Sequence, residues 1–423
     1  MNFSPKNALP SWLPQLAPQV WILAFGRFLS EVGTGFTLFY APIFFVNHVG
    51  LSATAVGFAL GSASISGVVG RILGGSFSDS QVWGRRKTLL LSAAISAIAS
   101  LVLASANYFW VLVVGNLLSG LGQGLYWPAN ESVVADLTAP AQRQEAYAIT
   151  RLADNLGMGM GVVLGGALIS TTGAYRVLFI VDATSFVFFF GVVYLAIKET
   201  YRPVDTKSAI SLKSSWLIAL SDRRLLIYVL VNIIFTTYVS QLQSTLPLYL
   251  KNFVALGQSK AGFTEATIST VFGWHLALAI VTQLPVARAL RRFSHSQSLS
   301  FSALMWALGF ILVWVTGVAT NHQLLWAILA LGVFAIAIVS YTPFASALVT
   351  DLAPPSQLGV YFSMSSLCWA VGYFIGPPLG GWALDRTPMF ADNFWLGLAL
   401  SVSILILILY YLEQILSRKQ EQE

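Results

Sequence analysis

The chain has 423 residues, of which 56% are hydrophobic and 9% charged, and its mean hydropathy is +0.73. Soluble domains carry about 25% charged residues, so a chain this poor in charge could not cover its surface in water, and a soluble enzyme is excluded. The net charge of +6 does not indicate nucleic acid, because the basic residues stand in short segments between apolar runs.

Twelve apolar segments follow along the chain, and a spanning helix needs about 20 mostly apolar residues. The polar linker 198–224 separates six of these segments from the other six. We predict an all-α membrane protein with twelve transmembrane helices in two pseudo-symmetric six-helix bundles around a central cavity, at 1–197 and 225–423. The segments are 20–47, 52–78, 87–106, 108–136, 146–170 and 175–197, then 224–249, 266–290, 298–318, 323–350, 360–384 and 393–414.

The distribution of basic residues predicts the orientation. With both termini and the linker 198–224 in the cytoplasm, 16 of the 23 Lys and Arg residues fall in cytoplasmic segments and four on the opposite side. We therefore expect a multi-pass protein of a bacterial cytoplasmic (inner) membrane. Residues 1–18 show no pattern of a cleavable signal. Cys368 is the only cysteine, so no internal disulfide or cysteine metal cluster is expected.

The two halves repeat each other at a constant offset of 215 residues. Parallel repeats of this kind are a known plan of transporters, with the substrate site between the halves. The identities pair Tyr126, Pro128, Asp136, Pro140 and Gln142 with Tyr341, Pro343, Asp351, Pro355 and Gln357, and Gly157, Gly161, Gly165 and Gly166 with Gly372, Gly376, Gly380 and Gly381.

Glycines four residues apart recur in both halves, and such spacing lets helix backbones approach closely. The glycine motif reads Gly372, Gly376, Pro377 and Gly380 in the second half, and Gly157, Gly161 and Gly165 in the first, without the proline. Close packing alone and a role in coupling are both open interpretations.

A second motif lies between segments 52–78 and 87–106, and a third within segment 108–136. The second consists of Gly75, Asp79, Gly84, Arg85 and Arg86. The third consists of Gly120 and Gly124, preceded by Asn116.

With these three motifs the chain resembles the major facilitator superfamily over its whole length, and within it the bacterial drug–proton antiporter branch. The resemblance implies that the second motif is a gating loop, with Asp79 pairing across the interface of the halves. Ser80 departs from the basic residue usual there, and the loop is two residues longer. Asn116 stands where the family often has an arginine implicated in proton coupling, which leaves the usual coupling route in doubt.

Ionisable residues within the apolar segments concentrate in the first half. Arg27 and Glu31 are one turn apart and share a helix face. Burial favours a neutral carboxyl and a nearby arginine favours a charged one, so Glu31 is expected to exchange a proton as its surroundings open and close. We predict that Glu31 carries the proton with Arg27 as its movable partner, and that Glu131 is the second candidate. A static ion pair is the alternative.

Other charges in these segments are expected to be structural. Arg151 and Asp154 lie one turn apart and would brace the cytoplasmic end, while Asp182 would cap or brace segment 175–197. Arg71 and Asp136 complete this set.

The resemblance implies that the first, fourth, seventh and tenth helices line the cavity. The fourth would add the stripe of Gln123, Trp127 and Glu131, spaced four residues apart. Aromatic and amide groups together fit an amphipathic organic molecule. The remaining expected cavity residues are Phe36, Tyr238, Gln241 and Tyr341.

We predict a secondary active transporter that works by alternating access, with proton-coupled export of an amphipathic small organic molecule or drug. A uniporter or proton-coupled importer of a sugar or other polar metabolite is one alternative, and a non-transporting membrane sensor or assembly partner is another. No catalytic constellation, phosphate loop or metal motif is visible, so we expect no enzyme activity, metal or cofactor. The expected partners are a small-molecule substrate, protons and the lipid bilayer, without nucleic acid, and the chain is expected to be a monomer.

Overall fold

The computed structural model describes residues 16–139, 142–201, 212–254, 262–354 and 358–420, and within them it contains helices and no strand. The first half contains α1 (Pro18–Leu38), α2 (Tyr40–Asn47), α3 (Ala53–Ser78), α4 (Gly84–Ser105), α5 (Phe109–Leu137), α6 (Arg143–Thr172) and α7 (Tyr175–Ala196). The rest contains α8 (Leu212–Ser221), α9 (Arg223–Asn252), α10 (Glu265–Leu290), α11 (His295–Val318), α12 (Gln323–Leu352), α13 (Leu358–Leu384) and α14 (Pro388–Gln420).

The predicted all-α membrane class is confirmed. Among the described residues, eleven helices are long and apolar enough to cross a membrane, with α1 and α2 together forming the first at Pro18–Asn47. The predicted segment 360–384 lies in α13, which is 27 residues long but is not one of these eleven. Twelve spans were expected, so the count of twelve is not confirmed.

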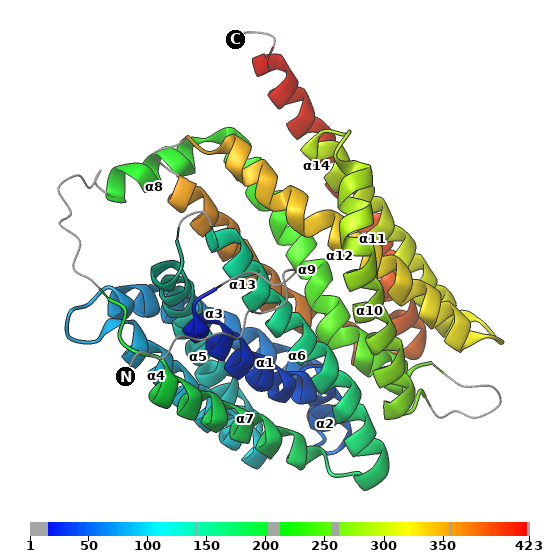
Figure 1. The fold of residues 1–423 in the computed structure, drawn as a ribbon. Helices are drawn as coiled ribbons and strands as arrows, with labels where there is room; N and C mark the ends of the chain where they lie inside the picture. The colour runs from blue at the N-terminus through cyan, green and yellow to red at the C-terminus, as the bar shows by residue number, and fades with distance from the viewer. Residues whose placement is uncertain (1–15, 140–141, 202–211, 255–261, 355–357, 421–423) are drawn as a thin grey trace.

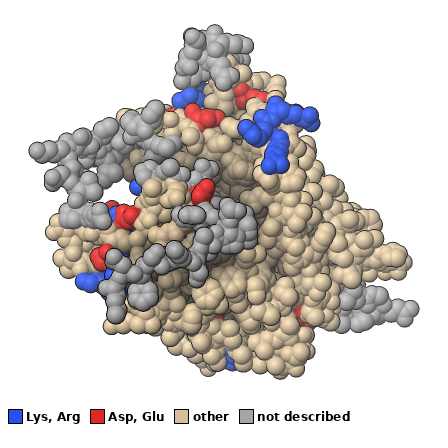
Figure 2. All heavy atoms as spheres, in the orientation of Figure 1, with Lys and Arg blue, Asp and Glu red and all other residues tan. Residues whose placement is uncertain are grey.

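The long helices form two bundles that lie side by side (Figure 1). Helices α1 and α3 to α7 pack on one another, and α9 to α14 form the second bundle. We call the side where α1 begins and α14 ends the terminal side, and the opposite side the far side. Figure 2 shows charged side chains mainly toward the edges of the molecule, with a broad uncharged surface between them, as lipid contact requires.

The glycine motif packs one helix against another inside each half. A Cβ atom on Gly161 of α6 would lie 2.8 Å from the Cα of Gly35 and would collide with the carbonyl oxygen of Val32, both on α1. Its counterpart Gly376 of α13 packs against the Ser240 side chain on α9. Gly157, Gly165, Gly372 and Gly380 likewise face α1 or α9.

The halves meet along two equivalent contacts, α3 with α13 and α6 with α10. At the far side, Asp385 accepts hydrogen bonds of 2.8 Å from the backbone N–H groups of Ala53 and Thr54. Asn47 and Asn252 exchange side-chain hydrogen bonds of 2.8 Å across the same end. Such contacts hold the far side closed.

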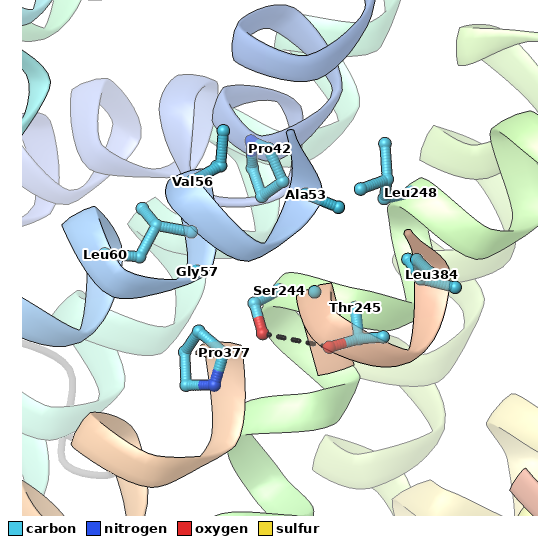
Figure 3. A pocket seen from close by; sticks show the side chains of 11 residues that line it. Pro42, Ala53, Val56, Gly57, Leu60, Ser244, Thr245, Leu248, Pro377 and Leu384 are labelled. Carbon is cyan, nitrogen blue, oxygen red and sulfur yellow. Dashed lines mark hydrogen bonds between the residues drawn. The ribbon is translucent and has the colours of Figure 1, made fainter. Parts of the chain in front are cut away.

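Close packing continues inward from these hydrogen bonds. Figure 3 shows Val56 and Leu60 of α3 opposite Thr245 of α9 and Pro377 of α13, with a narrow crevice between them. The backbone of Pro377 lies against Gly57, where a Cβ atom would collide with it. The glycine-motif residue Pro377 therefore takes part in the contact between the halves.

Candidate functional site

Three ionisable side chains meet inside the first half, and we call Arg27, Glu31 and Asp154 the charge cluster. Arg27 of α1 forms an ion pair with Glu31 one turn later, and its Nε donates a hydrogen bond of 2.9 Å to Asp154 of α6. The exposed fractions of the three residues are 6%, 4% and 8%. One guanidinium thus serves two buried carboxylates.

Aromatic rings cover the guanidinium of Arg27. Its central carbon lies 3.9 Å from the ring centroid of Tyr126 and 5.7 Å from that of Trp127, both on α5. The negative ring face attracts a cation, and this attraction strengthens where water is excluded. The rings therefore add to the forces that hold Arg27 in the cluster.

Glu131 and Arg151 form a separate and more exposed pair on the terminal half of α5 and α6. Their side chains lie 3.4 Å apart and are 52% and 56% exposed. Arg151 also lies over the ring of Trp127, with 4.2 Å between its central carbon and the ring centroid. Gln123 is exposed on the same helix. Arg151 and Asp154, expected as neighbours in one brace, thus belong to different clusters.

Arg71 of α3 reaches across to the second half, where it donates a hydrogen bond to Ser366 of α13. The other cross-half hydrogen bonds of the described residues lie nearer the far side, including that from Tyr175 to Glu265 at 2.5 Å. Arg71 therefore supplies a polar contact between the halves on the terminal side of these far-side bonds.

The predicted gating loop is anchored to its own half. Glu199 accepts hydrogen bonds of 2.9 and 3.1 Å from the backbone N–H groups of Arg85 and Arg86, in the first turn of α4. Gly84 has φ 71°, in the left-handed region that favours glycine, and Gly75 faces open space. The acidic group at this helix start is favourable, since the N-terminal N–H groups lack partners within the helix.

Arg85 forms an ion pair with Asp136 at the end of α5 and lies 3.9 Å from Asp79. Asp79 was expected to pair across the halves, but its partner in this structure belongs to its own half. The second half has a matching contact, because His295 at the start of α11 lies 3.0 Å from Asp351 at the end of α12. Asp136 and Asp351, which are equivalent in the repeat, thus each pair with a basic residue near the start of the preceding helix of their own half.

The expected cavity residues of the second half make internal contacts in this conformation. Tyr238 shares a hydrogen bond of 2.7 Å with Ser401 of α14, and Gln241 donates one of 2.7 Å to the Gly376 carbonyl. Tyr341 donates to Asn232 of α9. These side chains are buried in the second bundle rather than exposed between the halves.

Phe36 is also buried, with its Cα 3.2 Å from the position of a Cβ atom on Gly165. The close approach of α1 and α6 at this glycine therefore encloses the phenylalanine. Among the expected cavity residues, Trp127, Gln123 and Glu131 are the ones left partly or largely exposed.

The sequence alone did not predict that Asp154 belongs to the charge cluster or that Asn232 is a hydrogen-bond partner of Tyr341. Arg27 and Asp154 are 127 residues apart, and no spacing rule joins them. The glycines that bring α1 and α6 together were visible in the sequence, and they were the one available signal that charges on these two helices could meet.

Two bundles of membrane-spanning helices, closed together at one side and enclosing ionisable groups inside one bundle, define a multi-pass membrane transporter. Comparison with known proteins gives the family. The sequence model of the Major Facilitator Superfamily matches residues 23–259 and 253–423, and the chain belongs to this superfamily.

Curated relatives cover most of the chain. The chain is 25% identical to an uncharacterized MFS-type transporter, YqjV, of Bacillus subtilis, with 87% of each protein covered. It is 27% identical to the multidrug resistance protein MdtH of Yersinia enterocolitica, again over 87% of each. It is 24% identical to a Na(+), Li(+), K(+)/H(+) antiporter of Planococcus maritimus, covering 84% of this chain and 88% of that protein.

Solved structures share the fold. The nucleoside transporter NupG aligns with a TM-score of 0.78 at 12% identity, over 94% of this chain and 99% of the other. A peptide transporter, POT, in complex with sulfate aligns with a TM-score of 0.76 at 16% identity, over 96% and 97%. At these identities the likeness is one of fold.

Proposed function

We propose that the protein is a secondary active transporter that exports an amphipathic small organic molecule by alternating access, driven by inward movement of protons. The observation that carries this proposal is the charge cluster, in which Arg27 is shared by Glu31 and Asp154 away from water. With a single arginine between them, one of the two carboxylates is left without a full counter-charge and favours a proton.

Glu31 is the carboxylate that we assign to proton binding. Its Oε2 is buried and has no hydrogen-bond partner among the described residues, whereas Asp154 accepts the Nε hydrogen bond from Arg27. A proton on Glu31 would release Arg27 toward Asp154 and the ring of Tyr126. Loss of that proton would draw the guanidinium back. Proton binding thereby moves the side chain that joins α1 to α6, which is how a local charge can bias two packed states.

The terminal side is the side that we propose to be cytoplasmic, in a bacterial inner membrane, with the chain working as a monomer. The closed far side is then the side away from the cytoplasm. Trp127, Gln123 and the pair of Glu131 with Arg151 are exposed on the terminal half of the first bundle, where a substrate from the cytoplasm would arrive. An aromatic ring beside paired charges fits an amphipathic molecule with a charged or hydroxylated group.

The names of two relatives support this choice without deciding it. One is called a multidrug resistance protein and one a cation/proton antiporter, and both are below 30% identity to this chain. They make an organic substrate and proton coupling the first combination to test.

The test uses the purified full chain in liposomes with an imposed pH gradient, screened against fluorescent cationic dyes and against sugars. We expect dye transport that follows the pH gradient, and a Glu31→Gln variant that loses this dependence but still exchanges dye across the membrane. Glu145→Gln is the matched control, because Glu145 is exposed at the terminal end of α6. If transport by Glu31→Gln still depends on pH, the assignment of proton binding to Glu31 is wrong. Sugar transport indifferent to pH would favour a uniporter instead.

A further inference from the structure

We infer that Asp182 of α7 is a second proton-binding carboxyl of the first half, exchanging its proton with Glu31 of the charge cluster. This inference rests on the proposed proton coupling and extends it beyond Arg27, Glu31 and Asp154. It differs from the expectation that Asp182 only caps or braces its own helix.

Asp182 lies deep inside the first bundle, with 6% of its surface exposed. Its Oδ2 accepts a hydrogen bond of 2.6 Å from the Ser100 hydroxyl on α4. Its Oδ1 is buried and has no hydrogen-bond partner among the described residues. A buried carboxylate whose hydrogen-bond donors are neutral hydroxyls is poorly compensated, whereas a carboxylic acid in the same place is neutral.

Helix α1 packs against Asp182 at a level along its axis close to that of the charge cluster. A Cβ atom on Gly33 would lie 2.9 Å from the Cα of Asp182, so the two backbones are in close contact there. Gly33 follows Glu31 by two residues and Arg27 by six, which corresponds to about 3 Å and about 9 Å along the helix axis. From Asp154 through Glu31 to Asp182, the carboxyl groups therefore follow one another toward the closed far side.

The charges that face Asp182 are few. Helix α1 brings Arg27, Glu31 and the neutral hydroxyl of Thr34, and α4 brings the neutral hydroxyl of Ser100. On α7 itself, Arg176 near the far end donates to the carbonyl of Ala104, away from the cluster. Arg27 can neutralise one of the three carboxylates Asp154, Glu31 and Asp182. The cluster and Asp182 together hold two protons when they are electrically neutral.

The surroundings of Asp182 favour a proton over a metal cation. A Cβ atom on Gly33 would lie 2.7 Å from the Cβ of Ser185, which shows that α1 and α7 are packed together beside the carboxyl. The Ser185 hydroxyl already donates 2.7 Å to the carbonyl oxygen of Asp182. A sodium ion needs room for several oxygen ligands, but a proton needs only the free oxygen Oδ1.

The proposed step transfers one proton between two carboxyl groups. The O–H bond of protonated Glu31 breaks and an O–H bond forms on Oδ1 of Asp182. Glu31 becomes the carboxylate and shares Arg27 with Asp154, and the total charge of the group is unchanged. Both oxygens that take part, Oε2 of Glu31 and Oδ1 of Asp182, are the ones without partners in this conformation.

Infrared pH-difference spectra of the purified full chain test the inference, because the C=O stretch of a protonated carboxyl is separate from that of a carboxylate. We expect two buried carboxyl signals that change with pH in the unmodified protein. Asp182→Asn should remove one and leave the other, Glu31→Gln should remove the other, and the double variant should lose both. Asp392→Asn, which alters a half-buried carboxyl of the second half bonded to Tyr249, is the control and should leave both.

A spectrum of Asp182→Asn that matches the unmodified protein would overturn the inference. So would an Asp182 signal that responds to sodium at constant pH when choline is replaced, since that result indicates a cation site. Asp182→Glu serves if the asparagine variant does not fold, and it should shift the signal while keeping its pH response. The Asp182 signal is independent of transport, so failure of the Glu31→Gln transport test would leave this outcome readable.

Discussion

The two copies of the glycine motif place the same residue against different kinds of atoms. An alanine at Gly161 of α6 would press its methyl group onto the backbone of α1 at Val32 and Gly35, neither of which can rotate away. An alanine at Gly376 of α13 would meet mainly the hydroxyl of Ser240, which can turn at the loss of its bond of 2.7 Å to the Thr237 carbonyl. We expect Gly161→Ala to destabilise the protein more than Gly376→Ala.

The magnitude follows from two opposing effects. An extra methyl group in a packed interface costs about 1–3 kcal/mol, while glycine to alanine inside a helix gains about 1 kcal/mol. The net loss expected for Gly161→Ala is therefore up to about 2 kcal/mol. For Gly376→Ala the rotation of Ser240 relieves the closest overlap and leaves its Cβ at 2.9 Å, so the loss should be smaller, at about 1 kcal/mol or less. Gly191→Ala on α7 faces open space and should be neutral or slightly stabilising.

Unfolding in mixed micelles with increasing SDS, followed by circular dichroism, measures these differences on the full chain. The expected order of stability is Gly191→Ala first, then Gly376→Ala, then Gly161→Ala. Equal stability of the Gly161 and Gly191 variants would refute the claim that α1 and α6 touch through their backbones. If Gly376→Ala loses more stability than Gly161→Ala, the kind of atom that the new methyl group contacts does not determine the loss of stability.

Two further predictions concern the ends of the helices. Burial alone would raise the pKa of Asp222 at the start of α9, but hydrogen bonds from Arg224 and Tyr361 hold this pKa below its ordinary value. The ionised Asp222 thus stabilises the fold at pH values above its ordinary pKa of about 4, and this stabilisation is lost as the pH falls through the lowered pKa. Asp222→Asn should therefore lower the midpoint of unfolding at pH 7 and have little effect on it in strong acid. A chain with cysteines replacing Asn47 and Asn252 should cross-link under oxidation and lose transport, which a reductant restores; full transport in the cross-linked state would contradict closure at the far side.

Sequence periodicity predicted what lies within one helix, and it predicted much less between helices. The ion pair of Arg27 with Glu31 follows from their spacing of four residues, and the structure contains it. The bond from Arg27 to Asp154 does not follow from any spacing, because it depends on how far α6 is rotated about its axis against α1. The same limit explains Tyr238. The family resemblance placed its helix around a cavity, but the rotation of α9 directs the Tyr238 hydroxyl to Ser401 in the second bundle.

Equivalent positions in the two halves differ in whether they hold buried charged groups. Tyr126 and Tyr341 are equivalent by sequence, and each packs against the first helix of its own half. In the first half that partner is the guanidinium of Arg27, which holds two carboxylates. In the second half it is the neutral amide of Asn232, which also donates to Ser365. An amide gains and loses no proton near neutral pH, so an equivalent geometry in the second half can position a substrate or brace a helix but cannot carry the driving ion. The proton binding proposed for the first bundle would therefore reach the second through movement of one bundle against the other, at contacts that include α3 with α13 and α6 with α10.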